Sequence, residues 1–196
     1  METVSSRQVY ANPWMTVRED AIRRQDGSAG TYGVVDKPNY ALIIPADGDR
    51  LHLVEQFRYP LGLRRWEFPQ GTAPDRAVVE QAVLAERELR EETGLRAASM
   101  VEIGLLDVAP GHSSQRGRVY LATELTEGEA QREHEEQDMR GGWFTRTEFE
   151  QMIAEGLITD AQSIAAYALL LLHDRRAGVM PASSDGLPVS RTDRPE

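Results

Sequence analysis

The sequence contains no cysteine, which excludes disulfide bonds, thiolate nucleophiles and zinc sites ligated by cysteine. It has no excess of positive charge either, because 22 Lys and Arg stand against 32 Asp and Glu, a net charge of −10. Such a chain would repel the phosphates of a nucleic acid, so we expect no nucleic-acid partner. A small phosphate-bearing ligand stays compatible if a bound cation supplies the positive charge.

Long apolar runs are also absent. The longest, residues 164–172, is about half of the ~20 residues that a membrane-spanning helix needs. The N-terminus has neither the basic nor the apolar segment of a signal peptide. We therefore expect a cytoplasmic protein with no membrane partner. Residues 179–196 are rich in Pro, Ser and charge, and we expect them to form a flexible tail.

The first half of the chain has the pattern of β-strands. A strand-like segment from Val9 to Arg24, a QDGSAG turn and TYGVV predict one hairpin, and YALIIPA, DGDR and LHLVEQF predict a second. We assign no strand to LGLRRWEFPQG, which leads through a loop containing Pro and Gly to Ala77.

A helix is predicted over residues 77–93. An apolar stripe recurs at helical spacing, and Gly94 follows as a helix-ending residue. The stripe consists of Val78, Ala82, Ala85 and Leu89. Three further strands (VEIGLLDVA, RVYLATEL and GGWF) and two terminal helices, one from Arg146 and one over DAQSIAAYALLLLH, complete the pattern. The order predicts an α+β or mixed α/β fold.

The end of the central helix carries an unusual cluster of carboxylates. Glu88 and Glu92 lie one helical turn apart, with Glu91 between them and Arg87, so three carboxylates share an arc of about 100°. Such crowding repels unless a cation is bound, and oxygen ligands suit Mg²⁺ or Mn²⁺. Arg87 can orient Glu91, four residues later. The alternative is a solvated helix face with i,i+4 ion pairs.

The segment Arg87–Leu95 resembles the second half of the Nudix box of the Nudix hydrolase family, and it matches that half completely. The first half of the box differs from the family's pattern at two places. Val79 stands at the position of the family's first Glu, with Glu80 beside it, and Gly71 lies two residues further upstream than in the pattern. The resemblance covers roughly residues 14–173, with VEQFRYP and WEFPQG similar to the ADP-ribose pyrophosphatase branch. It implies a Nudix-type α/β/α sandwich.

The resemblance also implies site residues. The metal ligands would be Glu88, Glu91, Glu92 and the carbonyl of Gln70, with Mg²⁺ as the cofactor and Mn²⁺ possible. Arg58 would bind a phosphate or ribose, and Trp14 and Tyr32 would enclose the base, although a core role is the better expectation for Tyr32. The candidate general bases are Glu135 and Glu136, with Arg87 as a further catalytic residue.

The implied activity is metal-dependent hydrolysis of a nucleoside diphosphate linked to a second group X, with ADP-ribose as the leading substrate. The alternatives are another nucleotide sugar, a dinucleoside polyphosphate, or a nucleotide sensor without catalysis. We expect an N-terminal strand region over 1–40, a hydrolase domain over 41–178, and a homodimer in which the strand region contributes to the partner's pocket.

Overall fold

The computed structural model of the chain describes residues 1–73, 77–132 and 137–178. Within these ranges, no helix has both the length and the apolar character required to cross a membrane. The expected tail at 179–196 and the candidate bases Glu135 and Glu136 lie outside the described residues.

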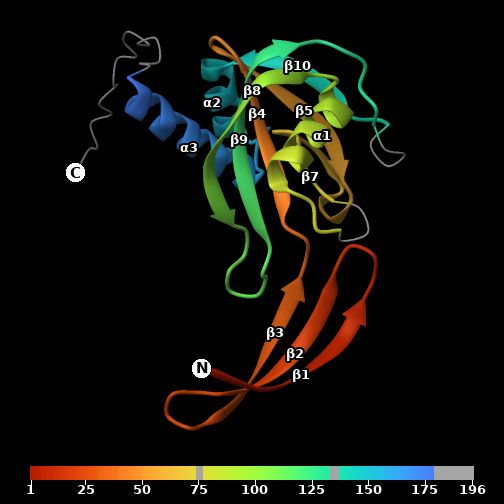
Figure 1. The fold of residues 1–196 in the computed structure, drawn as a ribbon, viewed down its shortest axis with the longest axis vertical. Coiled ribbons are helices and arrows are strands. Elements are labelled where there is room, and N and C mark those ends of the chain that lie inside the picture. The colour runs from red at the N-terminus through yellow and green to blue at the C-terminus, as the bar shows by residue number, and fades with distance from the viewer. Residues whose placement is uncertain (74–76, 133–136, 179–196) are drawn as a thin grey trace, which may run out of the picture.

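The N-terminal strands form a sheet of their own, which projects from the rest of the molecule (Figure 1). It contains β1 (Glu2–Ala11), β2 (Thr16–Arg23) and β3 (Ala29–Asp36), paired antiparallel in that order. The β2–β3 hairpin confirms the prediction. The prediction of one continuous strand from Val9 to Arg24 was wrong. The Asn12 side chain accepts hydrogen bonds from the backbone of Trp14 and Met15 and closes a turn between β1 and β2.

In the part of the chain that the structure describes, seven further strands form the central sheet: five in the order β10-β5-β4-β9-β8, and two short ones, β6 and β7, beside them. Their bounds are β4 (Tyr40–Asp47), β5 (Arg50–Arg58), β6 (Leu63–Glu67), β7 (Gln70–Thr72), β8 (Arg96–Asp107), β9 (Arg116–Thr126) and β10 (Arg140–Thr145). The predicted hairpin of β4 and β5 is confirmed. The short strands β6 and β7, which pair with β5 and β4, fall where we assigned no strand.

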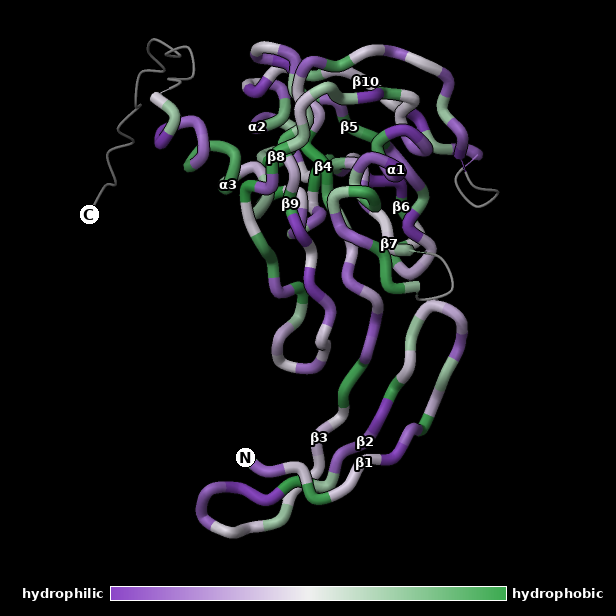
Figure 2. The backbone as a smooth tube through the Cα atoms, viewed as in Figure 1, coloured by the Kyte–Doolittle hydropathy of each residue, from purple (hydrophilic) through white to green (hydrophobic). Residues whose placement is uncertain are grey.

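Among the described residues, three α-helices cover the sheet: α1 (Gln81–Thr93), α2 (Arg146–Ala154) and α3 (Ala161–Ala177), with a short 3₁₀ turn η1 (Tyr59–Leu61) after β5. The central strand β4 is buried on both faces. Ala41 and Ile43 pack with α1, whereas Leu42 and Ile44 pack in the cluster that includes α2 and α3. Figure 2 shows this apolar centre in green. The arrangement confirms the predicted sandwich of helices around a sheet.

The helix α1 begins at Gln81, four residues later than predicted. Glu80 has an extended backbone, and its side chain accepts a hydrogen bond from the backbone N–H of Val83 at 3.0 Å, which caps the helix. Val78, placed in the predicted apolar stripe, lies before the helix and is fully exposed. The helix ends as predicted at Gly94, whose φ is +78°.

Candidate active site

A cavity of about 700 Å³, which we call the α1 cavity, opens beside the acidic end of α1. Carboxylates of α1, the backbone of β7, the end of β5 with η1, and two loop residues form its walls. The lining consists of Glu88, Glu91, Gly71, Thr72, Gln56, Phe57, Arg58, Tyr59, Pro60, Trp14 and Asp138. Residues from five separate parts of the chain therefore meet at one place.

The acidic helix face packs directly against β7. Glu88 and Glu92 are buried, at 6% and 1% exposure. A Cβ atom on Gly71 would lie 2.2 Å from Glu88 Oε2, so a larger residue here would require the Glu88 carboxylate to move. The backbone N–H of Gln70 donates to Glu92 Oε2 at 3.3 Å. The structure thus brings Gln70 and these two carboxylates together.

Arg87 lies between two of the carboxylates. Its Nη2 atom donates to Glu88 Oε1 at 2.9 Å, and its Nε atom lies 3.4 Å from Glu91 Oε2. The same Nη2 donates to the carbonyl of Thr72 at 3.4 Å. The sequence led us to expect the pairing with Glu91, and the contacts to Glu88 and β7 are additional. Arg87 therefore orients both side chains that face the cavity.

The atoms that line this site can be compared with the ligands that different metal ions prefer. No group of three or more acidic, histidine or cysteine side chains in the described parts of the chain is gathered closely enough to hold one. However, the groups that line the wall beside α1 are the carboxylates of Glu88 and Glu91 and the backbone around Gly71, which are oxygen donors. Oxygen donors suit a hard divalent cation such as Mg²⁺ or Mn²⁺ and disfavour zinc or copper. The donor types at this wall therefore fit such an ion.

Arg58, at the end of β5, is held in place by a buried carboxylate. Its Nε atom donates to Glu67 Oε2 at 3.1 Å, its Nη2 atom contacts the other oxygen, and Gln56 also donates to Glu67. Glu67 is 1% exposed, and burial raises its pKa to about 7, with the charge of Arg58 acting in the opposite direction. The guanidinium is therefore fixed at the edge of the α1 cavity.

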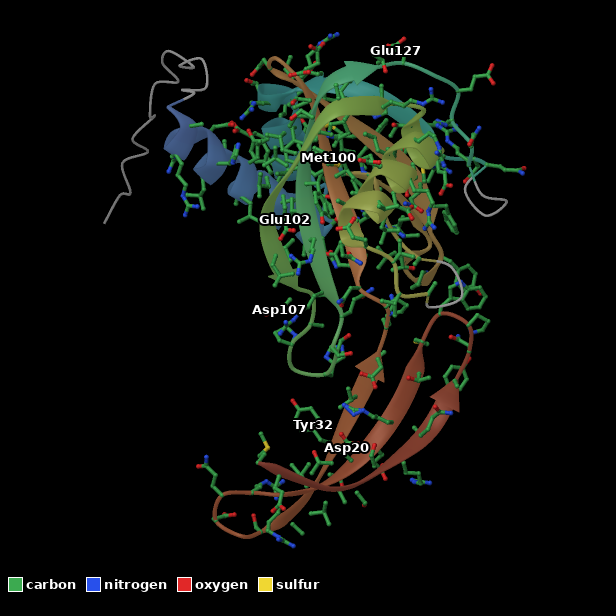
Figure 3. All side chains as sticks on the ribbon, in the orientation of Figure 1. Asp20, Tyr32, Met100, Glu102, Asp107 and Glu127 are labelled. Carbon is green, nitrogen blue, oxygen red and sulfur yellow. The ribbon has the colours of Figure 1, made fainter. Side chains whose placement is uncertain are left out.

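The two aromatic residues expected around the base are not brought together within this chain. Trp14 is 60% exposed and lines the α1 cavity. Tyr32 lies on β3 of the projecting sheet (Figure 3), where its hydroxyl donates to the carbonyl of Gly111 at 2.6 Å. The aromatic residues that share the cavity with Trp14 are Phe57 and Tyr59. In the sequence, their positions directly before and after Arg58 could have indicated that they belong to the site.

Asp138 is a further cavity residue that sequence reasoning missed. Arg64, on β6, donates to the Asp138 carboxylate at 2.5 Å and to its carbonyl at 2.9 Å. Arg132 joins the neighbouring backbone to α1, because it donates to the carbonyls of Glu92 at 3.1 Å and Met139 at 2.5 Å. The described residues on both sides of the segment 133–136 are thus attached beside the acidic helix.

Three further residues, Trp66, His112 and Glu80, make structural contacts. Trp66 is half-buried and packs edge-to-face on Phe144, with ring centroids 4.9 Å apart. His112 is exposed in the loop after β8, and its backbone carbonyl accepts from Val35. Glu80, beside the missing first Glu of the box, caps α1.

The chain is similar to known proteins in both sequence and fold. A family model described as the NUDIX domain matches residues 36–167, and one described as the nucleoside diphosphate sugar hydrolase N-terminal domain matches residues 1–35. The chain is 37% identical to an ADP-ribose pyrophosphatase of Mycobacterium tuberculosis, over 88% of this chain and 83% of that protein. It is 28% identical to an ADP-ribose pyrophosphatase of Bacillus subtilis, over 70% and 74% of the two chains. A crystal structure of an ADP compounds hydrolase has the same fold, with a TM-score of 0.78, 19% identity, and coverage of 91% and 96%.

Proposed function

The chain belongs to the NUDIX domain family and is a Nudix pyrophosphohydrolase, and from this premise we propose that it uses Mg²⁺ to hydrolyse a nucleoside diphosphate linked to a group X. The leading substrate is ADP-ribose, with AMP and ribose 5-phosphate as products. The relatives described as ADP-ribose pyrophosphatases support this substrate. The observation that carries the proposal is the α1 cavity, which joins carboxylates, a fixed guanidinium and exposed aromatic rings.

Each group at the cavity has a role in this reaction. Glu88, Glu91, Glu92 and the Gln70 carbonyl would hold Mg²⁺, or Mn²⁺ in its place. A divalent ion bound there would neutralise charge on the diphosphate and make a bound water more acidic. Arg87 orients Glu88 and Glu91 for this task. Arg58 offers a planar, charged fork to a phosphate, the geometry that guanidinium groups recognise.

Other parts of the chain would bind the purine base of the substrate and accept the proton of the attacking water. Trp14, together with Phe57 and Tyr59, offers exposed aromatic faces on which a purine can stack. We propose Glu135 as the group that accepts the proton of the attacking water, with Glu136 as the second choice. General-base catalysis of this kind contributes typically about 10²–10⁴ in rate.

We further propose that the protein acts as a cytoplasmic homodimer, with residues 1–40 as the strand region and 41–178 as the hydrolase domain. Tyr32, which lies outside the α1 cavity of its own chain, would then contribute to a base site only from the partner. The exposed strand β1 supports an assembly of this kind, since it is the edge strand of its sheet and every residue is exposed.

The substrate is tested by incubating the protein with Mg²⁺ or Mn²⁺ and a panel of nucleotides, with the products identified by mass. The panel contains ADP-ribose, other nucleotide sugars and dinucleoside polyphosphates. We expect the highest kcat/KM for ADP-ribose, with AMP as a product. Preferred turnover of a dinucleoside polyphosphate would reject ADP-ribose as the substrate, and turnover of none would reject the proposed reaction.

The metal site is tested by Glu88→Gln and Glu92→Gln. Each change removes one negative charge, and we expect metal-dependent turnover to fall by several orders of magnitude at limiting Mg²⁺. Thermal unfolding should be little changed, because relief of like-charge repulsion offsets lost pairing. The matched control is Glu86→Gln, an exposed residue of the same helix, which should keep the activity of the unmodified protein. Near-normal rates in both test variants would reject the metal assignment.

A further inference from the structure

The strands β5 and β6 bring three polar side chains to one face of their pair. Gln56 and Arg58 are two positions apart on β5, so their side chains point to the same side of the sheet. Glu67, on β6, is the register partner of Val54, which lies two positions before Gln56. Directly opposite residues also share a face. The register therefore places one carboxylate beside an amide and a guanidinium.

Both oxygens of the Glu67 carboxylate are occupied by these neighbours. Oε2 accepts from Nε of Arg58 at 3.1 Å, and Oε1 accepts from Nη2 of Arg58 and from the amide of Gln56. Nη1, at the other end of the guanidinium, makes no hydrogen bond within the described chain. That end stays available for a phosphate, which a planar guanidinium recognises in a defined orientation.

The two members of this ion pair face different surroundings. The side chain of Glu67 is 1% exposed, whereas that of Arg58 is 38% exposed. Arg58 lines the α1 cavity. Glu67 instead lines a separate cavity of about 320 Å³, which shares Arg58 and Pro60 with the α1 cavity. A ligand in the α1 cavity therefore meets the guanidinium and not the carboxylate behind it.

The segment that carries Glu67 is fixed to α3 and to the turn before that helix. The backbone N–H of Phe68 donates to the hydroxyl of Ser163 at 2.9 Å, and Nε of Arg65 donates to the hydroxyl of Thr159 at 3.1 Å. Phe68 is fully buried. The carboxylate thus projects from a backbone that is attached on both sides of it, so it can hold a neighbouring group in one place.

Stability alone gives little reason for a charge at this position. Burial of a carboxylate is costly, and replacement of a whole buried ion pair by apolar groups is often neutral or stabilising. An apolar residue at position 67, however, would leave the guanidinium of Arg58 without a fixed direction. The buried carboxylate is therefore better explained by the orientation that it imposes on Arg58.

We propose that Glu67 is a positioning residue for substrate binding, which holds the guanidinium of Arg58 so that its free end faces the diphosphate in the α1 cavity. Glu67 touches neither the substrate nor the metal and acts through Arg58. The inference rests on the proposed function, in which Arg58 binds a phosphate. Its effect falls on substrate affinity rather than on the chemical step.

The test is a double-mutant cycle of Glu67→Gln and Arg58→Ala, with kcat and KM measured for ADP-ribose and Mg²⁺. The assay is run well above the pKa of about 7 of Glu67, so that its carboxylate is ionised in the unmodified protein. Glutamine keeps the shape but exchanges one acceptor oxygen for a donor. We expect KM to rise by at least about tenfold in Glu67→Gln, with kcat within about threefold.

The double variant separates action through Arg58 from any other effect. If Glu67 acts through Arg58, the KM of the double variant should equal that of Arg58→Ala within about twofold. Glu67→Asp, which keeps the charge on a shorter side chain, should raise KM by less. It takes the place of Glu67→Gln in the cycle if the glutamine variant does not fold.

The matched control is Asp174→Asn. Asp174 is also a buried carboxylate, and it pairs with Arg146 at 2.6 Å between α3 and α2. Its loss should change stability but leave KM unaltered. If Glu67→Gln leaves KM unchanged, or raises it equally with and without Arg58, the positioning role is wrong and the proposed function stands. If the unmodified protein does not hydrolyse ADP-ribose, the proposed function fails, and the positioning role fails with it.

Discussion

At the scale of single residues, two buried ionisable groups give the fold opposite responses to pH. Burial raises the pKa of Glu67 to about 7, so its folded form takes up a proton at a higher pH than the unfolded chain. Burial lowers the pKa of His52 to about 4, and the charge of Arg132 adds to this effect. The contribution of Glu67 is therefore lost as pH rises from about 4.5 to 7, whereas that of His52 is lost as pH falls from about 6.5 towards 4.

His52 is expected to limit stability in mild acid. The residue is 8% exposed, its ring packs edge-to-face on Trp143 at 5.1 Å, and its Nδ1 atom has no partner among the described residues. Between pH 7 and 5 the unfolded chain binds a proton here that the folded protein excludes. This difference lowers the free energy of unfolding by about 2 kcal/mol.

The measurement is urea unfolding at pH 7 and pH 5 for the unmodified protein and for His52→Leu. Because Leu cannot be protonated, the variant should lose less stability on acidification, by about that amount. The contribution of Glu67 is common to both proteins and cancels in the comparison. His112→Gln, which changes an exposed loop histidine, is the control. Parallel pH dependences for His52→Leu and the unmodified protein would contradict the prediction.

At the scale of elements, the ends of α1 decide where the carboxylates lie. Gly94 ends the helix with a φ of +78°, and a Cβ atom there would lie 2.4 Å from the carbonyl oxygen of Gly128. Glu80 begins it, with its carboxylate on the backbone N–H of Val83. In the sequence, Glu80 lies beside Val79, which stands at the position of the first Glu of the Nudix box. The cap contact favours a purely structural role.

The change Glu80→Ala tests this role. Removal of an N-terminal cap costs typically about 1 kcal/mol, so we expect the free energy of unfolding to fall by about that amount. The kcat at saturating Mg²⁺ and the Mg²⁺ concentration at half-maximal rate should stay within about twofold. Glu80→Asp, which keeps a good capping side chain, should recover the stability. A large rise in the Mg²⁺ requirement would instead identify Glu80 as a metal ligand.

At the scale of the whole molecule, the projecting sheet β1–β3 lacks a core of its own. Ile22 is its one buried apolar residue, as far as the described chain shows, while Val4, Val9 and Tyr10 on β1 are about half exposed. β1 also presents an unpaired edge to solvent. Exposed edges of this kind pair readily with another chain, and two-fold dimers are the commonest assemblies.

We expect light scattering at micromolar concentration to give the mass of a dimer. The double change Val4→Lys and Val9→Lys places charge on β1 and should weaken the dimer by at least about tenfold. Val101→Lys, at an exposed valine of the edge strand β8, is the matched control and should leave the mass unchanged. A fully active monomer of the unmodified protein would reject both the dimer and a partner contribution to the site.

The sequence by itself determined the elements and the chemistry that depend on short spacings. The end of α1 at Gly94, the shared face of Glu88, Glu91 and Glu92, and the reach of Arg87 to Glu91 all follow from the geometry of one or two helical turns. The same holds for the hairpin of β4 and β5, which a short turn closes. These features need no knowledge of distant parts of the chain.

Only the tertiary structure decided which distant residues meet. The α1 cavity joins Trp14, in the turn after β1, to Phe57 and Tyr59 at the end of β5, whereas Tyr32 lies on β3 and does not line it. Gln70 and Asp160, which are 90 residues apart in the sequence, are likewise joined by a hydrogen bond of 3.2 Å. Strand order and register are set by the packing of both sheet faces, and no local period in the sequence encodes them.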